Sequence, residues 1–324
     1  MTARGGPPRI TVVGEAVIDL VPGADTGLYH ARPGGSPYNV AIGLARLGRT
    51  TTLMARLADT TFGRLLREHA EAEGVDLTSA AIAHEPATLA VVSTDDHGVA
   101  TYDFYREGTA DWGWTQSELD ALPADTEVLH FGSIASWTSP GRDAIHAAAA
   151  RMFATGEVLV SYDPNIRPSL MRGPADSCRL VEQSVSTAHV VKASIEDVDW
   201  LYPGRDLADV ARLWLELGAV LVVITEGPKG AHAFTTGIGQ MHRPAVPIEV
   251  VDTVGAGDAF TAGLLDALIR TGVATPSALG GCETATLTAS LDDAILIAAM
   301  TCERVGADSP TAAELEVRTS PGRG

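Results

Sequence analysis

The sequence predicts an α/β fold in which a mostly parallel sheet is covered by helices on both faces. Short apolar runs, typical of buried parallel strands, alternate along the chain with helical patterns. Alternation of this kind favours a layered fold over an all-β or an all-helical one. The expected strands lie at 10–13, 51–54, 89–93, 101–105, 128–131, 158–162, 189–191, 220–225 and 231–235, and the clearest helices at 62–73, 141–155 and 207–217.

One part of the chain departs from this alternation. Around residues 85–107 two strands follow each other without a helix, and the turn between them carries Asp95, Asp96, His97 and Gly98, which is hairpin chemistry. We expect strands near 20–33 and 88–106 to project from the body as a small lid. The remaining divisions are a disordered tail at 1–8, one domain at 9–315 and a C-terminal tail at 316–324. Residues 272–290 are rich in Gly, Ala, Ser and Thr and predict a surface loop.

Composition narrows the functional classes. The 324 residues are 45% hydrophobic and 20% charged, which is ordinary for a globular protein. A formal charge of −18 disfavours nucleic acid and anionic lipid as partners. No run approaches the ~20 apolar residues of a membrane helix, and the first eight residues lack a secretory signal, so we expect a cytoplasmic protein with no membrane partner. The three cysteines, Cys178, Cys282 and Cys302, form no metal-ligand spacing and are expected to be free thiols.

The first candidate site is a helix start that follows two glycines, Gly34 and Gly35. We expect Ser36 to cap this helix and Gly48 to end it. Capping does not require two adjacent glycines or an asparagine at position 39. A backbone without Cβ atoms lets a ligand approach closely, and the Asn39 side chain can both donate and accept hydrogen bonds. The segment therefore predicts a site for a polyhydroxylated ligand.

The second candidate site is the run Gly255, Ala256, Gly257 and Asp258, which opens an apolar helix. Glycines at a helix start leave N–H groups and the positive end of the helix dipole facing outward, which suits an anion. Asp258 could simply favour the dipole. A carboxylate beside an anion site is also what phosphoryl transfer to a hydroxyl needs, because it can take the hydroxyl proton.

In this order, the two motifs resemble the paired signatures of the PfkB carbohydrate kinases, whose fold is the ribokinase-like three-layer sandwich. The resemblance extends from residue 10 to residue 312, and the residues at 34–39 and 163–167 are similar to those of bacterial fructokinases. The chain has neither a Walker-type loop nor a protein-kinase catalytic loop. The resemblance implies transfer of the ATP γ-phosphoryl group to a sugar.

The resemblance also assigns roles to individual residues. It makes Asp258 the catalytic base and Gly255, Ala256 and Gly257 the anion hole, with Gly255 and Gly257 also contacting the nucleotide. The expected sugar-binding residues are Asp19, Gly34, Gly35, Asn39, Arg106 and Arg167; Arg167 ends the segment 163–167, and an ordinary loop ion pair is its alternative reading. The expected nucleotide-binding residues are Thr225, Gly227, Lys229 and Gly230, for which a tight turn is the alternative, together with Lys192 and Ser194. The two lysines are the only ones in the chain, and both fall in these motifs.

The metal site is where the chain departs from the family pattern. Asp197 stands where the family has Glu, and Glu196 lies one position earlier. Either could serve the Mg²⁺ that accompanies ATP, or both could belong to a solvated helix start, where acids favour the dipole. A monovalent cation such as K⁺ is a further expected cofactor.

These observations together predict an ATP-dependent sugar kinase that converts fructose to fructose 6-phosphate. Kinases of 2-keto-3-deoxygluconate, ribose or a nucleoside are the alternatives within the same fold. A catalytically inactive sugar- or nucleotide-binding protein is the alternative from another class. The expected partners are the sugar and ATP, with a homodimer through the lid also considered.

Overall fold

An eight-stranded sheet forms the middle layer of the protein. The computed structural model describes residues 8–25, 27–94 and 100–320. In this sheet the strand order is β14-β13-β12-β11-β10-β9-β1-β4, and the pairs are parallel except for β12–β13 and β13–β14. The strands are β1 Arg9–Val13, β4 Thr51–Met54, β9 Thr126–Gly132, β10 Leu159–Asp163, β11 Val190–Ser194, β12 Leu221–Thr225, β13 Ala231–Thr235 and β14 Gly239–Arg243.

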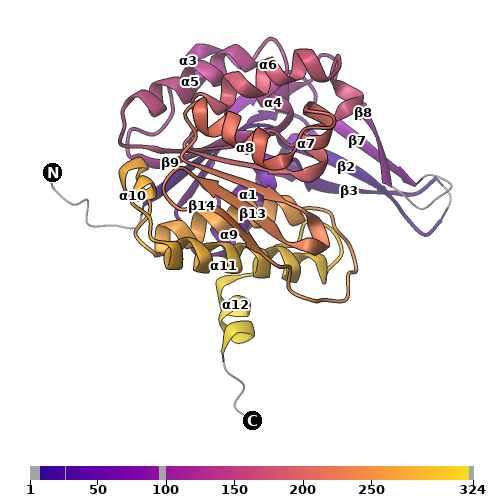
Figure 1. Ribbon diagram of the computed structural model, residues 1–324. Coiled ribbons are helices and arrows are strands. Elements are labelled where there is room, and N and C mark those ends of the chain that lie inside the picture. Colours follow the sequence, from indigo (N-terminus) through magenta and orange to yellow (C-terminus); the bar gives the residue numbers. More distant parts are fainter. Residues whose placement is uncertain (1–7, 26, 95–99, 321–324) are drawn as a thin grey trace.

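Helices cover both faces of this sheet (Figure 1). One face carries α1 Ser36–Arg46, α2 Thr61–Ala72, α9 Ala256–Arg270, α10 Pro276–Gly280 and α11 Thr284–Cys302. The other carries α3 Gln116–Leu119, α4 Ser133–Trp137, α5 Arg142–Ala154, α6 Pro174–Val185, α7 Ile195–Leu201 and α8 Leu207–Glu216. The predicted three-layer α/β architecture is confirmed.

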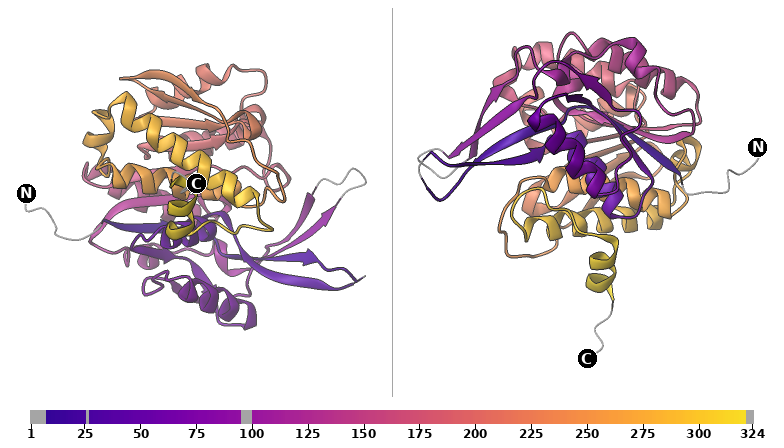
Figure 2. Two further views of the ribbon diagram at one scale, coloured as in Figure 1. Left: turned by 90° about the horizontal axis from the view of Figure 1, so that it is seen from below. Right: turned by 180° about the vertical axis from the view of Figure 1, so that it is seen from behind.

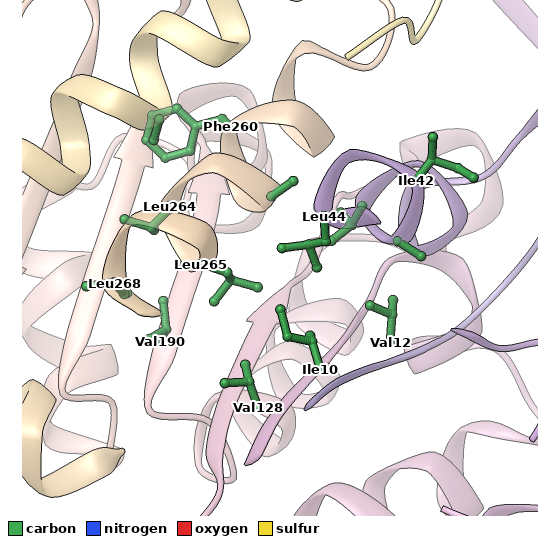
Figure 3. Packing of buried hydrophobic residues seen from close by; sticks show 14 of the residues in the cluster. Ile10, Val12, Ile42, Leu44, Val128, Val190, Phe260, Leu264, Leu265 and Leu268 are labelled. Carbon is green, nitrogen blue, oxygen red and sulfur yellow. The ribbon is translucent and has the colours of Figure 1, made fainter. Parts of the chain in front are cut away.

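The continuous apolar runs of the strands are explained by burial on both faces. In β12, Leu221 and Val223 belong to the core under α1, α9 and α11, whereas Val222 and Ile224 belong to the core under α5, α6 and α8. Figure 3 shows the first of these cores, where side chains from β1, β9 and β11 meet α1 and α9. A strand between two helical layers needs apolar side chains at successive positions. These strands therefore lack the alternation of apolar and polar residues that is typical of half-buried strands.

A second, four-stranded sheet projects from one side of the body (Figure 2). Its order is β3-β2-β7-β8, with strands β2 Val17–Pro22, β3 Tyr29–Gly34, β7 Leu89–Thr94 and β8 Ala100–Tyr105. These strands occupy the segments expected to form a lid. The predicted hairpin turn at 95–98 lies outside the described residues. Two short strands, β5 Arg56–Ala58 and β6 Ala81–Ala83, form a separate parallel pair.

One expectation about the C-terminal part needs correction. Residues 272–290 do not form a surface loop, because they contain α10 and the first seven residues of α11, whose Leu287 and Ser290 are buried. Helix α11 packs closely against α9, where Gly263 lies against Ala294 and Ile297. By length and hydropathy α11 resembles a membrane span, yet half of its most apolar window is buried inside the protein. Helix α12 Ala312–Thr319 crosses the boundary expected at residue 315. The N-terminal tail at 1–7 and residues 321–324 lie outside the described part.

Candidate active site

Asp258 lies in the first turn of α9 and is buried against the start of α1. Its Oδ1 accepts a hydrogen bond from Ser36 Oγ at 2.6 Å, and its Oδ2 accepts one from Asn39 Nδ2 at 2.8 Å. The two glycine-rich motifs, more than 200 residues apart, therefore meet at one carboxylate. Burial raises the pKa of Asp258, while the bonds from Ser36 and Asn39 and the charge of Lys192 oppose that rise.

Ser36 is the residue whose role the sequence did not reveal. It was expected to cap α1, but Gly35 occupies the cap position and no side-chain cap bond forms there. Ser36 instead faces α9 and holds Asp258. Helix capping is a local property that a sequence pattern can indicate, whereas this contact depends on how α1 and α9 pack.

Close backbone approach explains two of the predicted glycines. A Cβ atom on Gly34 would lie 2.3 Å from Asp19 Oδ2, so any other residue at the β3–α1 junction would displace that carboxylate. Gly255 has a φ of 76°, and a Cβ there would lie 2.4 Å from the Cβ of Ala307. Its left-handed conformation sets the start of α9, the turn that carries Asp258. In this turn the Ala256 N–H donates to the Thr253 carbonyl at 3.2 Å, which leaves the Gly257 N–H available to a ligand.

A buried lysine stands beside the start of α9. A Cβ on Gly257 would lie 3.0 Å from Lys192 Nζ, so the ammonium group borders the predicted anion hole. Lys192 also donates a 3.0 Å hydrogen bond to Asp163 Oδ2 at the end of β10. Burial lowers the pKa of Lys192, but the carboxylates of Asp163, Asp197 and Asp258 together more than offset this, so the pKa is raised and the group stays charged. A fixed cation and helix N–H groups thus face the same space, as a phosphoryl group requires.

Asp19 lies on β2 near both Asp258 and Arg167. Burial raises its pKa to about 6; the positive charge of Arg167 opposes the shift, and the Asp258 carboxylate adds to it. Arg167 follows β10, and its Nη1 donates to Asn165 Oδ1 at 2.7 Å. Tyr102 of β8, which the sequence did not single out, is close enough for Asp19 and Arg167 to act on its pKa; burial is the largest cause of its rise. The lid sheet therefore lies beside Asp19 and Arg167.

The predicted metal residues differ in their surroundings. Asp197 is buried; its Oδ2 accepts from the Ser194 backbone N–H at 2.9 Å and its Oδ1 from the Ile166 N–H at 2.8 Å. Ser194 Oγ in turn accepts from the Asp197 N–H, completing a capping box at the start of α7. Glu196 is exposed to solvent. Within the described residues no three His, Cys, Asp or Glu side chains gather as a metal-binding group.

The predicted nucleotide loop lies at the end of β12, in the turn to β13. Gly227 and Gly230 have φ angles of 49° and 103°, and Lys229 forms an exposed ion pair with Glu226 at 2.6 Å. Thr225 Oγ1 donates to the Ala193 carbonyl at 3.4 Å, joining the ends of β12 and β11. The nucleotide loop at 225–230 and the segment that carries Lys192 and Ser194 therefore both lie at the carboxyl edge of the parallel sheet. Ligands of open α/β sheets bind at this edge.

Arg106 follows β8 and lines a cavity that does not include Asp258. That cavity also contains Trp137, Arg142 and Arg172, and none of the other predicted sugar-binding residues.

Comparison with known proteins agrees with this geometry. Residues 7–314 match the model of the pfkB family carbohydrate kinases. This chain belongs to that family. The family member is 39% identical to a fructokinase of Rhizobium leguminosarum bv. trifolii over 263 residues, covering 80% of this chain and 79% of the relative.

Solved structures show the same fold. A fructokinase from Xylella fastidiosa with bound ATP has a TM-score of 0.89 at 26% identity, covering 97% of this chain and 99% of the other. A double mutant of the Vibrio cholerae O395 fructokinase, with fructose, ADP and potassium ion bound, has a TM-score of 0.83 at 28% identity, covering 96% and 97%. The protein is a ribokinase-like carbohydrate kinase, as the sequence predicted.

The raised pKa of Asp19 predicts how pH affects this carbohydrate kinase. As pH falls through about 6, the Asp19 carboxylate takes up a proton. In the sugar-binding role expected for Asp19, this would remove its capacity to accept two hydrogen bonds from sugar hydroxyls. The KM for sugar should therefore rise between pH 7 and pH 5. Asp19→Asn should have a high KM that no longer varies over this range, whereas Asp103→Asn, on the exposed side of β8, should behave like the unmodified enzyme. Steady-state kinetics at fixed ionic strength measure this, and a KM for the unmodified enzyme that stays flat from pH 7 to pH 5 contradicts the role given to Asp19.

Proposed function

We propose that this protein is an ATP-dependent fructokinase that phosphorylates the O6 hydroxyl of fructose. The observation that carries the proposal is Asp258, a buried carboxylate held by Ser36 and Asn39 at the anion-binding start of α9. A buried base at a helix N-terminus suits proton removal from a hydroxyl and charge stabilisation on the group transferred to it. Fructose is proposed because the relatives described above carry the name fructokinase.

The residues of the site divide the work as follows. Bound ATP would supply the phosphoryl group. Asp19, Asn39 and Arg167 would hold the sugar hydroxyls and place one of them beside Asp258, which takes its proton. The free N–H groups of residues 255–257 and the Lys192 ammonium would hold the negative charge of the transferred group. Because the pKa of Asp258 is raised, its carboxylate is a stronger base than an exposed aspartate.

A substrate panel tests the choice of sugar. Fructose should give the highest kcat/KM among fructose, ribose, adenosine, glucose and 2-keto-3-deoxygluconate, measured by coupled detection of ADP. A preference for another sugar would move the protein to a different substrate within the family. If the protein binds a sugar but forms ADP with none of the five compounds, the inactive binding protein would be favoured.

We infer that Mg²⁺ at this site would be coordinated mainly by water and phosphate oxygens and less by protein side chains. The Asp197 oxygens already accept two backbone hydrogen bonds, and its neighbour Asp163 is paired with Lys192. Mg²⁺ commonly keeps several of its waters in kinase sites, so Asp197 fits a role behind an ordered water. The charges of Asp163 and Asp197 would attract the ion to this edge of the sheet.

The two acidic positions can be separated by their Mg²⁺ dependence. Asp197→Asn should raise the Mg²⁺ concentration required for half-maximal rate while leaving the fructose KM nearly unchanged. Glu196→Gln should change neither, because Glu196 is exposed. Thermal unfolding of both variants would show whether loss of the capping box alone accounts for the effect. A reversed pattern would move the metal role to Glu196.

The remaining expectations also stay proposals. Potassium activation is proposed because the structure of the Vibrio cholerae O395 fructokinase described above contains that ion. Replacing K⁺ by a bulky organic cation tests it.

A homodimer through the lid is proposed because four large apolar or aromatic side chains are exposed there, those of Val21, Leu28, Tyr29 and Tyr105. Light scattering at several protein concentrations tests it. We propose a cytoplasmic location, and a single kinase domain at 9–315.

A further inference from the structure

A cavity of about 630 Å³ opens beside the root of the lid, where none of the proposed catalytic residues lies. It is enclosed by the residues that follow β8, the end of α4, the start of α5, the short helix Pro168–Leu170 and one side of α6. Its volume lies in the range of sites that hold a small organic ligand. Part of the wall is apolar, with side chains from Trp137, Leu170 and Leu180.

The charge of this cavity is opposite to that of the protein. Arg106, Arg142, Arg172 and Arg179 line it, and Asp176 is the one acidic residue among the lining positions. Arg179 pairs with Asp176, and Arg142 pairs with Asp143, which lies outside the lining. For Arg106 and Arg172 the described part of the chain offers no acidic partner within ion-pair distance. The lining of this cavity therefore carries more guanidinium groups than carboxylates, although the protein as a whole has a net charge of −18.

A second cavity shows that clustered arginine is not enough. About 400 Å³ in volume, it lies between α11 and α12 and contains Arg304 and Arg318. Both are matched there by Glu314 and Glu303 at 2.7 Å and 2.9 Å. That cavity is electrically balanced, whereas the one beside the lid is not.

The backbone adds to the positive field of the lid-side cavity. Arg142 is the first residue of α5, and α6 begins at Pro174, two residues before Asp176. At the start of α5 the Gly141 and Arg142 N–H groups already donate to the Trp112 and Thr138 carbonyls at 2.9 Å and 3.1 Å. The two helices, each longer than three turns, therefore add to the field only through the positive ends of their dipoles. Planar guanidinium groups bind phosphate and carboxylate oxygens in pairs, and Arg is preferred over Lys where such binding matters.

We propose that this cavity is a binding site for a small organic phosphate that carries a second anionic group, separate from the sugar and ATP sites. The phosphate is held by the guanidinium groups at the α5 and α6 helix starts. The carbon chain lies against Trp137 and Leu170, and the second anionic group reaches Arg106 at the root of the lid strand β8. The Arg106 carbonyl is itself fixed by Trp112 Nε1 at 2.9 Å and Thr109 Oγ1 at 2.8 Å, so a bound anion would contact a rigid part of the lid root.

Calorimetric titration of the full-length protein with 3-phosphoglycerate tests this proposal. Sugar and a non-hydrolysable ATP analogue are present at saturation, so that the active site is filled. One molecule should bind per chain, and glycerate, which lacks the phosphate, should bind at least about tenfold more weakly because a charge-assisted pair is lost. Arg172→Gln and Arg179→Gln should each weaken binding of 3-phosphoglycerate by about tenfold or more.

The chain offers a closely matched control. Arg212 on α8 pairs with Asp209 three residues earlier, as Arg179 pairs with Asp176 on α6, and both arginines are exposed. Arg212→Gln should leave the affinity unchanged, because this residue does not line the cavity. The proposal is overturned if 3-phosphoglycerate does not bind, if filling the active site abolishes binding, or if Arg179→Gln and Arg212→Gln have the same effect.

Discussion

Replacing Asp258 by asparagine is expected to lower kcat by about 10²–10⁴-fold, the range for loss of a general base. An amide cannot take the sugar proton. It is nearly the same size as the carboxylate, so the contact between α1 and α9 should persist. Sugar binding, measured by calorimetry without turnover, should survive. Turnover near that of the unmodified enzyme would remove Asp258 from the mechanism.

The matched control for this variant lies on the same helix. Asp266 is also buried on α9, about two turns after Asp258, but its oxygens pair with Arg49 at 2.6 Å and Arg270 at 3.0 Å. Asp266→Asn should lower the free energy of unfolding and leave kcat of the folded enzyme unchanged. Ser36→Ala should give an intermediate loss of turnover, because it removes the 2.6 Å bond that orients Asp258 but leaves the base itself.

The two lysines are expected to differ sharply. Lys192→Met should lower kcat by about 10²–10³-fold, the range for loss of one preorganised charge at a developing anion. Lys229→Met should change kcat by less than about threefold, because an exposed ion pair contributes little. The Lys192 side chain is 6% exposed and that of Lys229 is 71% exposed. Equal effects of the two substitutions would contradict the assignment of Lys192 to the transferred group.

Lys192→Met also leaves the buried Asp163 without its partner, which can cost about 3–5 kcal/mol of stability. The double variant Lys192→Met/Asp163→Asn removes both charges and should regain part of this stability. Its turnover should remain low if Lys192 acts on the transferred group. Recovery of turnover together with stability would show that the lysine is needed only for folding.

The patterns that predicted most were local ones. Strands such as β12 were recognisable because a strand buried on both faces needs consecutive apolar residues. The start of α9 was recognisable because glycines followed by an aspartate leave a distinctive helix N-terminus. In contrast, residues 272–290 were misread, because small residues in a packed helix have the composition of a loop.

The sequence by itself determined the α/β class, the carbohydrate-kinase family and the position of Asp258, since each depends on residues close together in the chain. Only the tertiary structure decided that Ser36 holds Asp258, that Lys192 stands beside Gly257, and that the Asp197 oxygens are taken up by backbone N–H groups. It also brought arginines from three segments around one cavity. The physical reason is the same in every case: hydrogen bonds and charges act over a few ångströms in space, and which distant residues come that close depends on how the layers pack.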